Sequence, residues 1–243
     1  MSLQKIVKEF IKTISKNKNI ISVIQVGSSL WDVKSKDIDL VIVTKGYFPS
    51  SNDLIFLERV KKKFTKRYGI TFGGGGLFSK IRKLNIDIIF LPEKFDVMYA
   101  FKPLLYYGMS LSPYKILYGI DFFKQIRRKL RKPSEKDILF KFGPFTNFYL
   151  SCMLDFSRFV SKYQIALSIT KIILYSLVFM KGKYVKKTEL IPFLKKNYDF
   201  FNKLCEKYKI DDEIFHKKLS KKELLNLYEF LKELLIILYK NFK

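Results

Sequence analysis

The sequence predicts an α+β protein, in which a small mixed sheet with its helices is followed by an all-helical domain. Three observations support this prediction. Runs rich in β-branched residues alternate with helical patterns up to residue 119, only helical patterns follow residue 133, and a basic segment, RRKLRKPS at residues 127–134, lies between them. We therefore expect two domains, residues 1–130 and residues 131–243, with their boundary in the basic segment.

The first half of the chain carries alternating strand and helix patterns. β-Branched runs such as IISVIQV predict buried strands, and apolar residues three or four apart predict amphipathic helices. The predicted elements are helices over residues 3–17 and 51–68, and strands over residues 20–26, 37–44, 85–91 and 115–119. The glycine run Gly73–Gly76 breaks both patterns, so we expect a flexible hairpin tip there.

The second half shows the periodicity of long amphipathic helices. We expect them over residues 134–160, 164–181, 187–208 and 220–242. The apolar stretch 165–180 is interrupted by Lys171 and is shorter than the roughly 20 residues of a membrane span, so it predicts a buried helix and no membrane partner. The first residues, MSLQKIVKEF, lack the apolar block of a secretory signal, and we expect a cytoplasmic protein.

The chain is poor in residues that bind zinc or form nucleophilic triads. Its two cysteines, Cys152 and Cys205, lie in helical patterns, so we expect both to be reduced and inert. The single histidine, His216, lies in a polar helical context that is typical of a surface residue. Zinc chemistry and a Ser/His/Asp triad therefore have little support.

The net charge of +25 arises from 47 basic residues against 22 acidic ones. A positive field of this size attracts polyanions such as nucleoside triphosphates and RNA, and it repels cationic substrates. The alternative is that the lysines are dispersed charges that solvate the helix faces. Both interpretations stay open at this point.

Three aspartates are the candidate metal ligands. Side chains two apart on a strand share a face and lie about 6.6 Å apart, so Asp37 and Asp39 point together while Ile38 points away. Like charges at the head of an apolar strand are unfavourable unless a cation lies between them, and Mg²⁺ or Mn²⁺ suits such an oxygen site. Asp87, in a similarly apolar strand, offers a third ligand. The alternative is that Asp37 merely begins a strand and Asp87 pairs with a lysine.

The segment before these acids favours the metal-binding interpretation. A strand that ends in Gly27 and Ser28 and leads into a short helix presents backbone N–H groups and a hydroxyl, which suit the phosphates of a nucleotide. Lys36 could contact a phosphate as well. Trp31 could stack on a base or fill the domain core.

The run GSSLWDVKSKDIDLVIV resembles the signature of the DNA polymerase β nucleotidyltransferase superfamily. NIDIIFL resembles the strand that carries the third carboxylate of that family, and KILYGIDFF resembles a later strand followed by a helix. The segment KIILYSLVFMKGKYVKKTELIPFL is distantly similar to the helical domain of aminoglycoside adenylyltransferases. Trp31, Asp32 and Lys36 depart from the residues that many members carry.

This resemblance implies a two-metal nucleotidyltransferase. Asp37, Asp39 and Asp87 would be catalytic and would hold Mg²⁺ or Mn²⁺, while a nucleoside monophosphate moves from a nucleoside triphosphate to an acceptor hydroxyl. Gly27, Ser28 and Lys36 would bind the nucleotide, and the helical domain would bind the acceptor. Two alternatives are a catalytically silent nucleotide- or RNA-binding module, such as a toxin–antitoxin partner, and a helical interaction protein whose acids are structural.

The acceptor is expected to be anionic. An aminoglycoside is cationic and needs an acidic pocket, whereas residues 134–243 are crowded with lysine. A phosphate-bearing acceptor such as an RNA end therefore fits the charge better.

Overall fold

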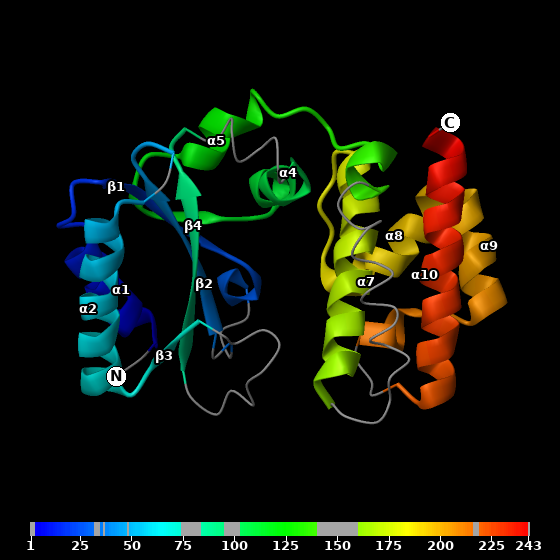
Figure 1. Ribbon diagram of the computed structural model, residues 1–243, viewed down its shortest axis with the longest axis horizontal. Coiled ribbons are helices and arrows are strands. Elements are labelled where there is room, and N and C mark those ends of the chain that lie inside the picture. Colours follow the sequence, from blue (N-terminus) through cyan, green and yellow to red (C-terminus); the bar gives the residue numbers. More distant parts are fainter. Residues whose placement is uncertain are drawn as a thin grey trace. The chain divides into compact units, whose positions relative to one another are not determined.

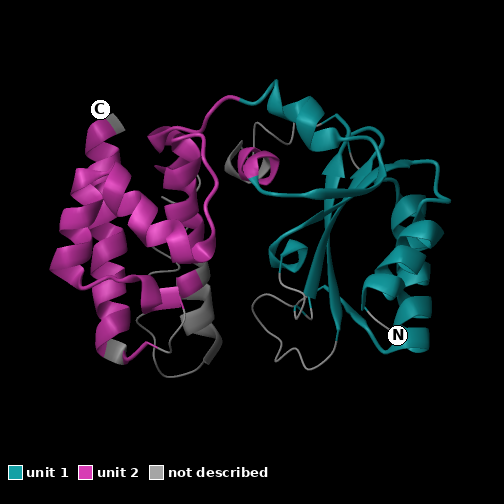
Figure 2. Ribbon diagram, turned by 180° about the vertical axis from the view of Figure 1, so that it is seen from behind, with its two compact units in different colours: residues 1–102, 112–130 teal, residues 103–111, 131–243 magenta. Residues whose placement is uncertain are grey.

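The computed structural model describes residues 3–31, 35, 37–47, 49–73, 84–94, 103–139, 160–215 and 219–242. In this part of the chain the fold is α+β, with a five-stranded mixed sheet and a C-terminal helical region, which confirms the predicted class (Figure 1). The chain divides into two compact units (Figure 2). The first unit contains Met1–Lys102 and Ser112–Leu130, and the second contains Pro103–Leu111 and Arg131–Lys243.

The first unit contains the whole sheet. Its elements are α1 (Leu3–Ile14), β1 (Ile20–Val26), the 3-10 helix η1 (Ser28–Leu30), β2 (Asp37–Thr44), α2 (Ser51–Tyr68), β3 (Thr71–Phe72), β4 (Asn85–Pro92), β5 (Lys115–Gly119) and α5 (Phe122–Arg127). All four predicted strands are present, and three of them have the predicted bounds. The first helix ends at Ile14, three residues before its predicted end.

The strand order is β3-β4-β2-β1-β5. β1 is antiparallel to both of its neighbours, whereas β2 and β3 are parallel to β4. β3 and β4 are parallel and so do not form a hairpin with each other, whereas the flexible hairpin tip predicted at Gly73–Gly76 falls mostly on residues outside the described part. Gly73 ends β3 with a positive φ of 75°, and Gly74–Gly76 lie outside the described residues.

The core of the first unit lies between the sheet and the helices α1 and α2, which lie side by side on one face (Figure 1). Phe10 of α1 is fully buried and meets Phe64 of α2 edge to face, with ring centroids 5.4 Å apart. β2 contributes every second residue to this core: Ile38, Leu40 and Ile42. The same alternation directs its aspartates to the opposite face of the sheet.

In the second unit every described element is a helix. The elements are α4 (Pro103–Leu111), α7 (Val160–Met180), η2 (Lys187–Glu189), α8 (Leu190–Asn197), α9 (Asp199–Tyr208), η3 (Asp212–Phe215) and α10 (Lys221–Phe242). The helix predicted over 187–208 is interrupted at Tyr198, whose backbone is extended (φ −144°, ψ 104°). Of the helix predicted over 134–160, residues 135–139 are helical, and residues 140–159 lie outside the described part.

The apolar helix α7 packs into the core of the second unit, as predicted. Ile173, Leu174, Leu177 and Val178 are fully buried there. Among the described helices, none has the length and apolar character that crossing a membrane would require. Cys205 belongs to the same core, and burial raises the pKa of its thiol to about 12, as expected for an inert cysteine. Cys152 and His216 lie outside the described residues.

Candidate metal centre

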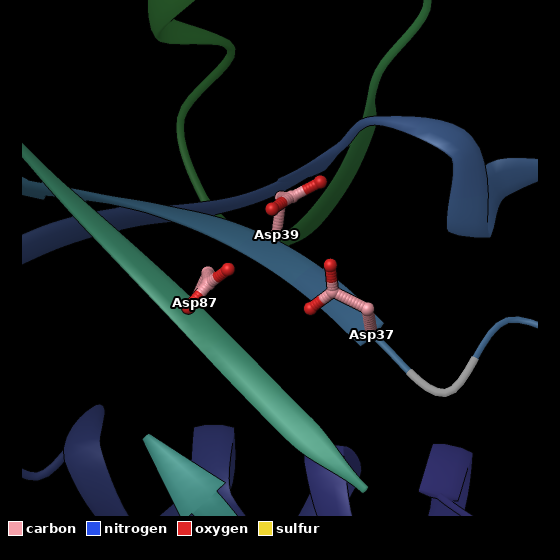
Figure 3. A group of neighbouring side chains, drawn as sticks. All are labelled: Asp37, Asp39 and Asp87. Carbon is pink, nitrogen blue, oxygen red and sulfur yellow. The ribbon is translucent and has the colours of Figure 1, made fainter. Parts of the chain in front are cut away.

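Three aspartates meet on the face of the sheet that points away from α1 and α2. Asp37 and Asp39 lie on β2, and Asp87 lies on the neighbouring strand β4 (Figure 3). The parallel register places Asp39 opposite Asp87 and Asp37 opposite Asn85. One carboxylate oxygen from each aspartate lies within 4.8 Å of the other two. The predicted ligands are therefore brought together by the pairing of two strands that are far apart in the sequence.

The three carboxylates are half-buried and repel one another. Burial, with the nearby charges of Asp37 and Asp87, raises the pKa of Asp39 to about 6. The pKa of Asp37 is also raised, chiefly by burial and further by Asp87, although a hydrogen bond from Asn85 opposes the rise. None of the lysines and arginines that the structure describes forms an ion pair with these acids. In this part of the chain no lysine pairs with Asp87, so the structural alternative for this residue finds no support there.

The donor set fits a hard divalent cation. All ligand atoms are carboxylate oxygens, which Mg²⁺ and Mn²⁺ prefer. Oxygens around one Mg²⁺ lie about 3 Å apart when adjacent and about 4.2 Å apart when opposite, so the three carboxylates, which lie within 4.8 Å of one another, would move slightly closer to share one ion. A bound cation would also offset both the repulsion among the carboxylates and the cost of burying their charges.

Gly27 lies directly against this carboxylate group. It follows β1 and precedes η1, as predicted for a strand that ends in Gly and Ser and opens a short helix. Its φ is 83°, and a Cβ atom at this position would lie 2.1 Å from Oδ2 of Asp39. Glycine is therefore required at this position for two reasons: the backbone conformation and the close approach of the Asp39 side chain.

Of the other two predicted nucleotide-binding residues, Ser28 and Lys36, the structure describes Ser28. Ser28 is exposed at the start of η1, and its carbonyl accepts a hydrogen bond from the Trp31 N–H at 3.1 Å. The adjacent Ser29 hydroxyl accepts one from Nε2 of Gln25 at 3.0 Å. Lys36 lies outside the described residues.

Trp31 does not fill the core, which corrects one of the two alternatives for this residue. Its side chain is 44% exposed, and it lines a cavity of about 690 Å³ together with residues of α1 and β5. Ile38 lines the same cavity, so the cavity lies on the opposite face of the sheet from Asp37 and Asp39.

Asn85 is a site residue that sequence reasoning missed. Its side chain is 1% exposed, and its Nδ2 donates to Oδ1 of Asp37 at 3.1 Å and to Oδ1 of Asp87 at 3.0 Å. The available signal was its position two residues before Asp87 on a strand, which places both side chains on one face. Its contact with Asp37 depends on the register of β2 and β4, and this register cannot be read from a single sequence.

Comparison with known proteins adds little to this geometry. No known protein family and no curated protein matches the chain at a significant level. Among solved structures, it is similar to spectinomycin adenyltransferase AAD(9) from Enterococcus faecialis, solved with ATP and spectinomycin. The TM-score is 0.37 with 13% sequence identity, over 94% of this chain and 98% of that one. So distant a likeness carries no argument about the site, and its interpretation rests on the residues described above.

Proposed function

We propose that this protein is a metal-dependent nucleotidyltransferase, which moves a nucleoside monophosphate from a nucleoside triphosphate to an acceptor hydroxyl. One observation carries the proposal: carboxylates from two parallel strands converge within 4.8 Å beside a glycine-led turn. Half-buried acids without an ion-pair partner among the described residues need a cation, and the turn at Gly27 lies directly against the carboxylate of Asp39.

Each site residue has a role in this proposal. Asp37, Asp39 and Asp87 would hold one or two Mg²⁺ or Mn²⁺ ions, which neutralise phosphate charge and lower the pKa of a nearby hydroxyl. The backbone and hydroxyl of Gly27 and Ser28 would hold the terminal phosphates, and Lys36 would contact a phosphate. Most of the rate enhancement would come from positioning and charge neutralisation.

The reaction needs no covalent enzyme intermediate. The acceptor oxygen forms a bond to the α-phosphorus, and the bond between that phosphorus and the bridging oxygen of the β-phosphate breaks. Pyrophosphate leaves with the electron pair of the broken bond. The proton of the acceptor hydroxyl passes to Asp87 and then to solvent.

We favour an anionic acceptor, such as an RNA end, over a cationic antibiotic. The net charge of +25 attracts phosphate-bearing molecules and repels aminoglycosides. The helices of the second unit are the proposed acceptor-binding part, and among them α8 carries Lys195 and Lys196 with no acidic residue.

Release of pyrophosphate tests the proposed function. The protein is incubated with each nucleoside triphosphate, Mg²⁺, and either short RNA or small hydroxyl-bearing acceptors. We expect Mg²⁺-dependent release that Asp37→Asn, Asp39→Asn and Asp87→Asn each abolish, whereas Asp212→Asn, which neutralises an exposed acid of η3, leaves it unchanged. Nucleotide binding without release would instead support the silent binding module. Full turnover by Asp37→Asn or Asp39→Asn would show that the metal site is wrong.

A further inference from the structure

We propose that Asn85, held in place by Thr71, is a positioning residue that sets the orientation of the Asp37 and Asp87 carboxylates for metal binding. This inference rests on the proposed function, because it concerns the same carboxylate site. It adds two residues from outside the acidic group, one of them on the edge strand β3.

The amide of Asn85 bridges two carboxylates that lie on different strands. One Nδ2 group donates to Asp37 of β2 at 3.1 Å and to Asp87 of β4 at 3.0 Å. Its two N–H bonds suffice for these two acceptors, so the nitrogen has no spare donor for another partner. In both Asp37 and Asp87, Oδ1 accepts this hydrogen bond. The bond limits rotation of the carboxylate group and leaves Oδ2 free to bind a metal ion.

Thr71 holds the oxygen end of the amide, while the two carboxylates decide which end faces them. Its hydroxyl lies 2.9 Å from Oδ1 of Asn85 and donates to it. A flipped amide would set the Asn85 oxygen against two carboxylates, which is electrostatically unfavourable. Thr71 is itself placed by the sheet, because it pairs with Asn85 in register and its N–H donates to the Leu84 carbonyl at 3.0 Å.

The result is a chain of hydrogen bonds across three strands. It runs from Thr71 on β3 through Asn85 on β4 to Asp37 on β2 and back to Asp87 on β4. Partners that orient metal ligands in this way commonly account for 10- to 100-fold in metal affinity. Because both donors of the buried Asn85 amide go to carboxylates of the site, its removal would free both acids to rotate.

Titration with Mn²⁺ alone tests this inference. Thr71→Val keeps the shape of the side chain but removes the hydroxyl, and we expect Mn²⁺ affinity to fall by about 3- to 10-fold. Thr71→Ser retains the hydroxyl and should restore affinity to within about 2-fold. Asn85→Ala should lower affinity by about 10- to 100-fold, and adding Thr71→Val to it should cause no further loss, because the two residues act in series. Thr65→Val, at an exposed position of α2, is the matched control and should change nothing.

The outcomes separate this inference from the proposed function. If the wild-type protein binds no Mn²⁺, the metal site itself fails. If the wild type binds Mn²⁺ and Thr71→Val and Thr71→Ser both bind it equally well, the positioning role is wrong and the proposed function stands. Should Asn85→Ala fail to fold, the conservative pair at Thr71 still decides the question. A weakened variant should also regain pyrophosphate release at higher Mg²⁺ concentration, which a purely structural defect would not allow.

Discussion

Asp39 is the residue at which the electrostatic cost of the site is greatest. Its pKa is raised to about 6 by burial and by the charges of Asp37 and Asp87. Because the folded state holds this proton more tightly than the unfolded chain, the contribution of Asp39 to stability is complete below about pH 4. That contribution is lost as the pH rises through about 6.

Asp39→Asn should therefore stabilise the metal-free protein at high pH. We expect its free energy of unfolding to exceed that of the wild type by about 1 to 3 kcal/mol near pH 8, and by little below about pH 4. Denaturant unfolding in the presence of a chelator measures this difference. Added Mg²⁺ should stabilise the wild type more than the variant. A variant that is less stable than the wild type at pH 8 without metal would contradict the electrostatic interpretation.

Replacing Gly27 should both strain the backbone and disturb the carboxylate site, and comparison with a second glycine separates the two effects. In Gly27→Ala the new Cβ would lie 2.1 Å from Oδ2 of Asp39, so the carboxylate or the turn must move. We expect a loss of about 1 to 3 kcal/mol in stability and about 10-fold or more in Mn²⁺ affinity.

Gly46 provides the matched control for Gly27. Its φ is 77°, close to that of Gly27, but a Cβ atom there would meet no heavy atom within 4 Å. Gly46→Ala should therefore lose stability through backbone strain alone, less than Gly27→Ala does, and leave Mn²⁺ affinity unchanged. Equal loss of metal binding in both variants would mean that the approach of Gly27 to Asp39 has no role in the site.

At the scale of elements, α2 is fixed at its N-terminus by Asp53. Its carboxylate and the Ser50 hydroxyl form a capping box, and Nδ2 of Asn17 also donates to it at 2.8 Å. Burial alone would raise the pKa of Asp53, but hydrogen bonds from Asn17, Ser50 and Asn19 outweigh it, so the pKa is lowered. This stability is present above the ordinary aspartate pKa and is lost as the pH falls.

Asp53→Ala should destabilise the first unit without disturbing the metal centre. We expect a loss of about 1 to 3 kcal/mol near pH 7, because the capping box is removed and the groups of Asn17, Asn19 and Ser50 that donate to Asp53 lose their acceptor. Thermal unfolding measures the loss, and a Mn²⁺ titration below the melting temperature should match the wild type. An unchanged melting temperature would contradict the role given to the cap.

The elements that were predicted correctly are those whose pattern is local. β1, β2 and β5 are runs of β-branched and apolar residues flanked by turn residues, and their bounds follow from that pattern. β3 has two residues, too few to show a period, so neither the strand nor its parallel pairing with β4 could be predicted from the sequence. The break at Tyr198 depends on tertiary structure, since its hydroxyl donates to the Leu177 carbonyl at 2.9 Å.

The site could be predicted in part for the same reason. Asp37 and Asp39 share a strand, so alternation alone places them on one face. That Asp87 and Asn85 join them follows from the parallel register of β2 and β4. Register is set by the packing of the whole sheet against α1 and α2, and it has no local signature in the sequence.

At the scale of the whole molecule, the net charge of +25 should govern acceptor binding. Binding of short RNA should weaken steeply as salt is raised, with a slope of about −0.7 in log affinity per log salt for each neutralised phosphate. Titrations with RNA and with an aminoglycoside at low and moderate salt measure this. Tight, salt-insensitive aminoglycoside binding without RNA binding would reverse the proposed preference for an anionic acceptor.

The most direct test of the proposed metal centre is the number and location of Mn²⁺ ions bound in the presence of a non-hydrolysable nucleoside triphosphate. Electron paramagnetic resonance can count bound Mn²⁺ in the wild type and in Asp39→Asn, with Asp212→Asn as the control. We expect the wild type and the control to bind Mn²⁺ with the nucleotide, and Asp39→Asn to lose at least one ion. Equal Mn²⁺ binding by all three proteins would contradict the assignment of Asp37, Asp39 and Asp87 as the metal centre.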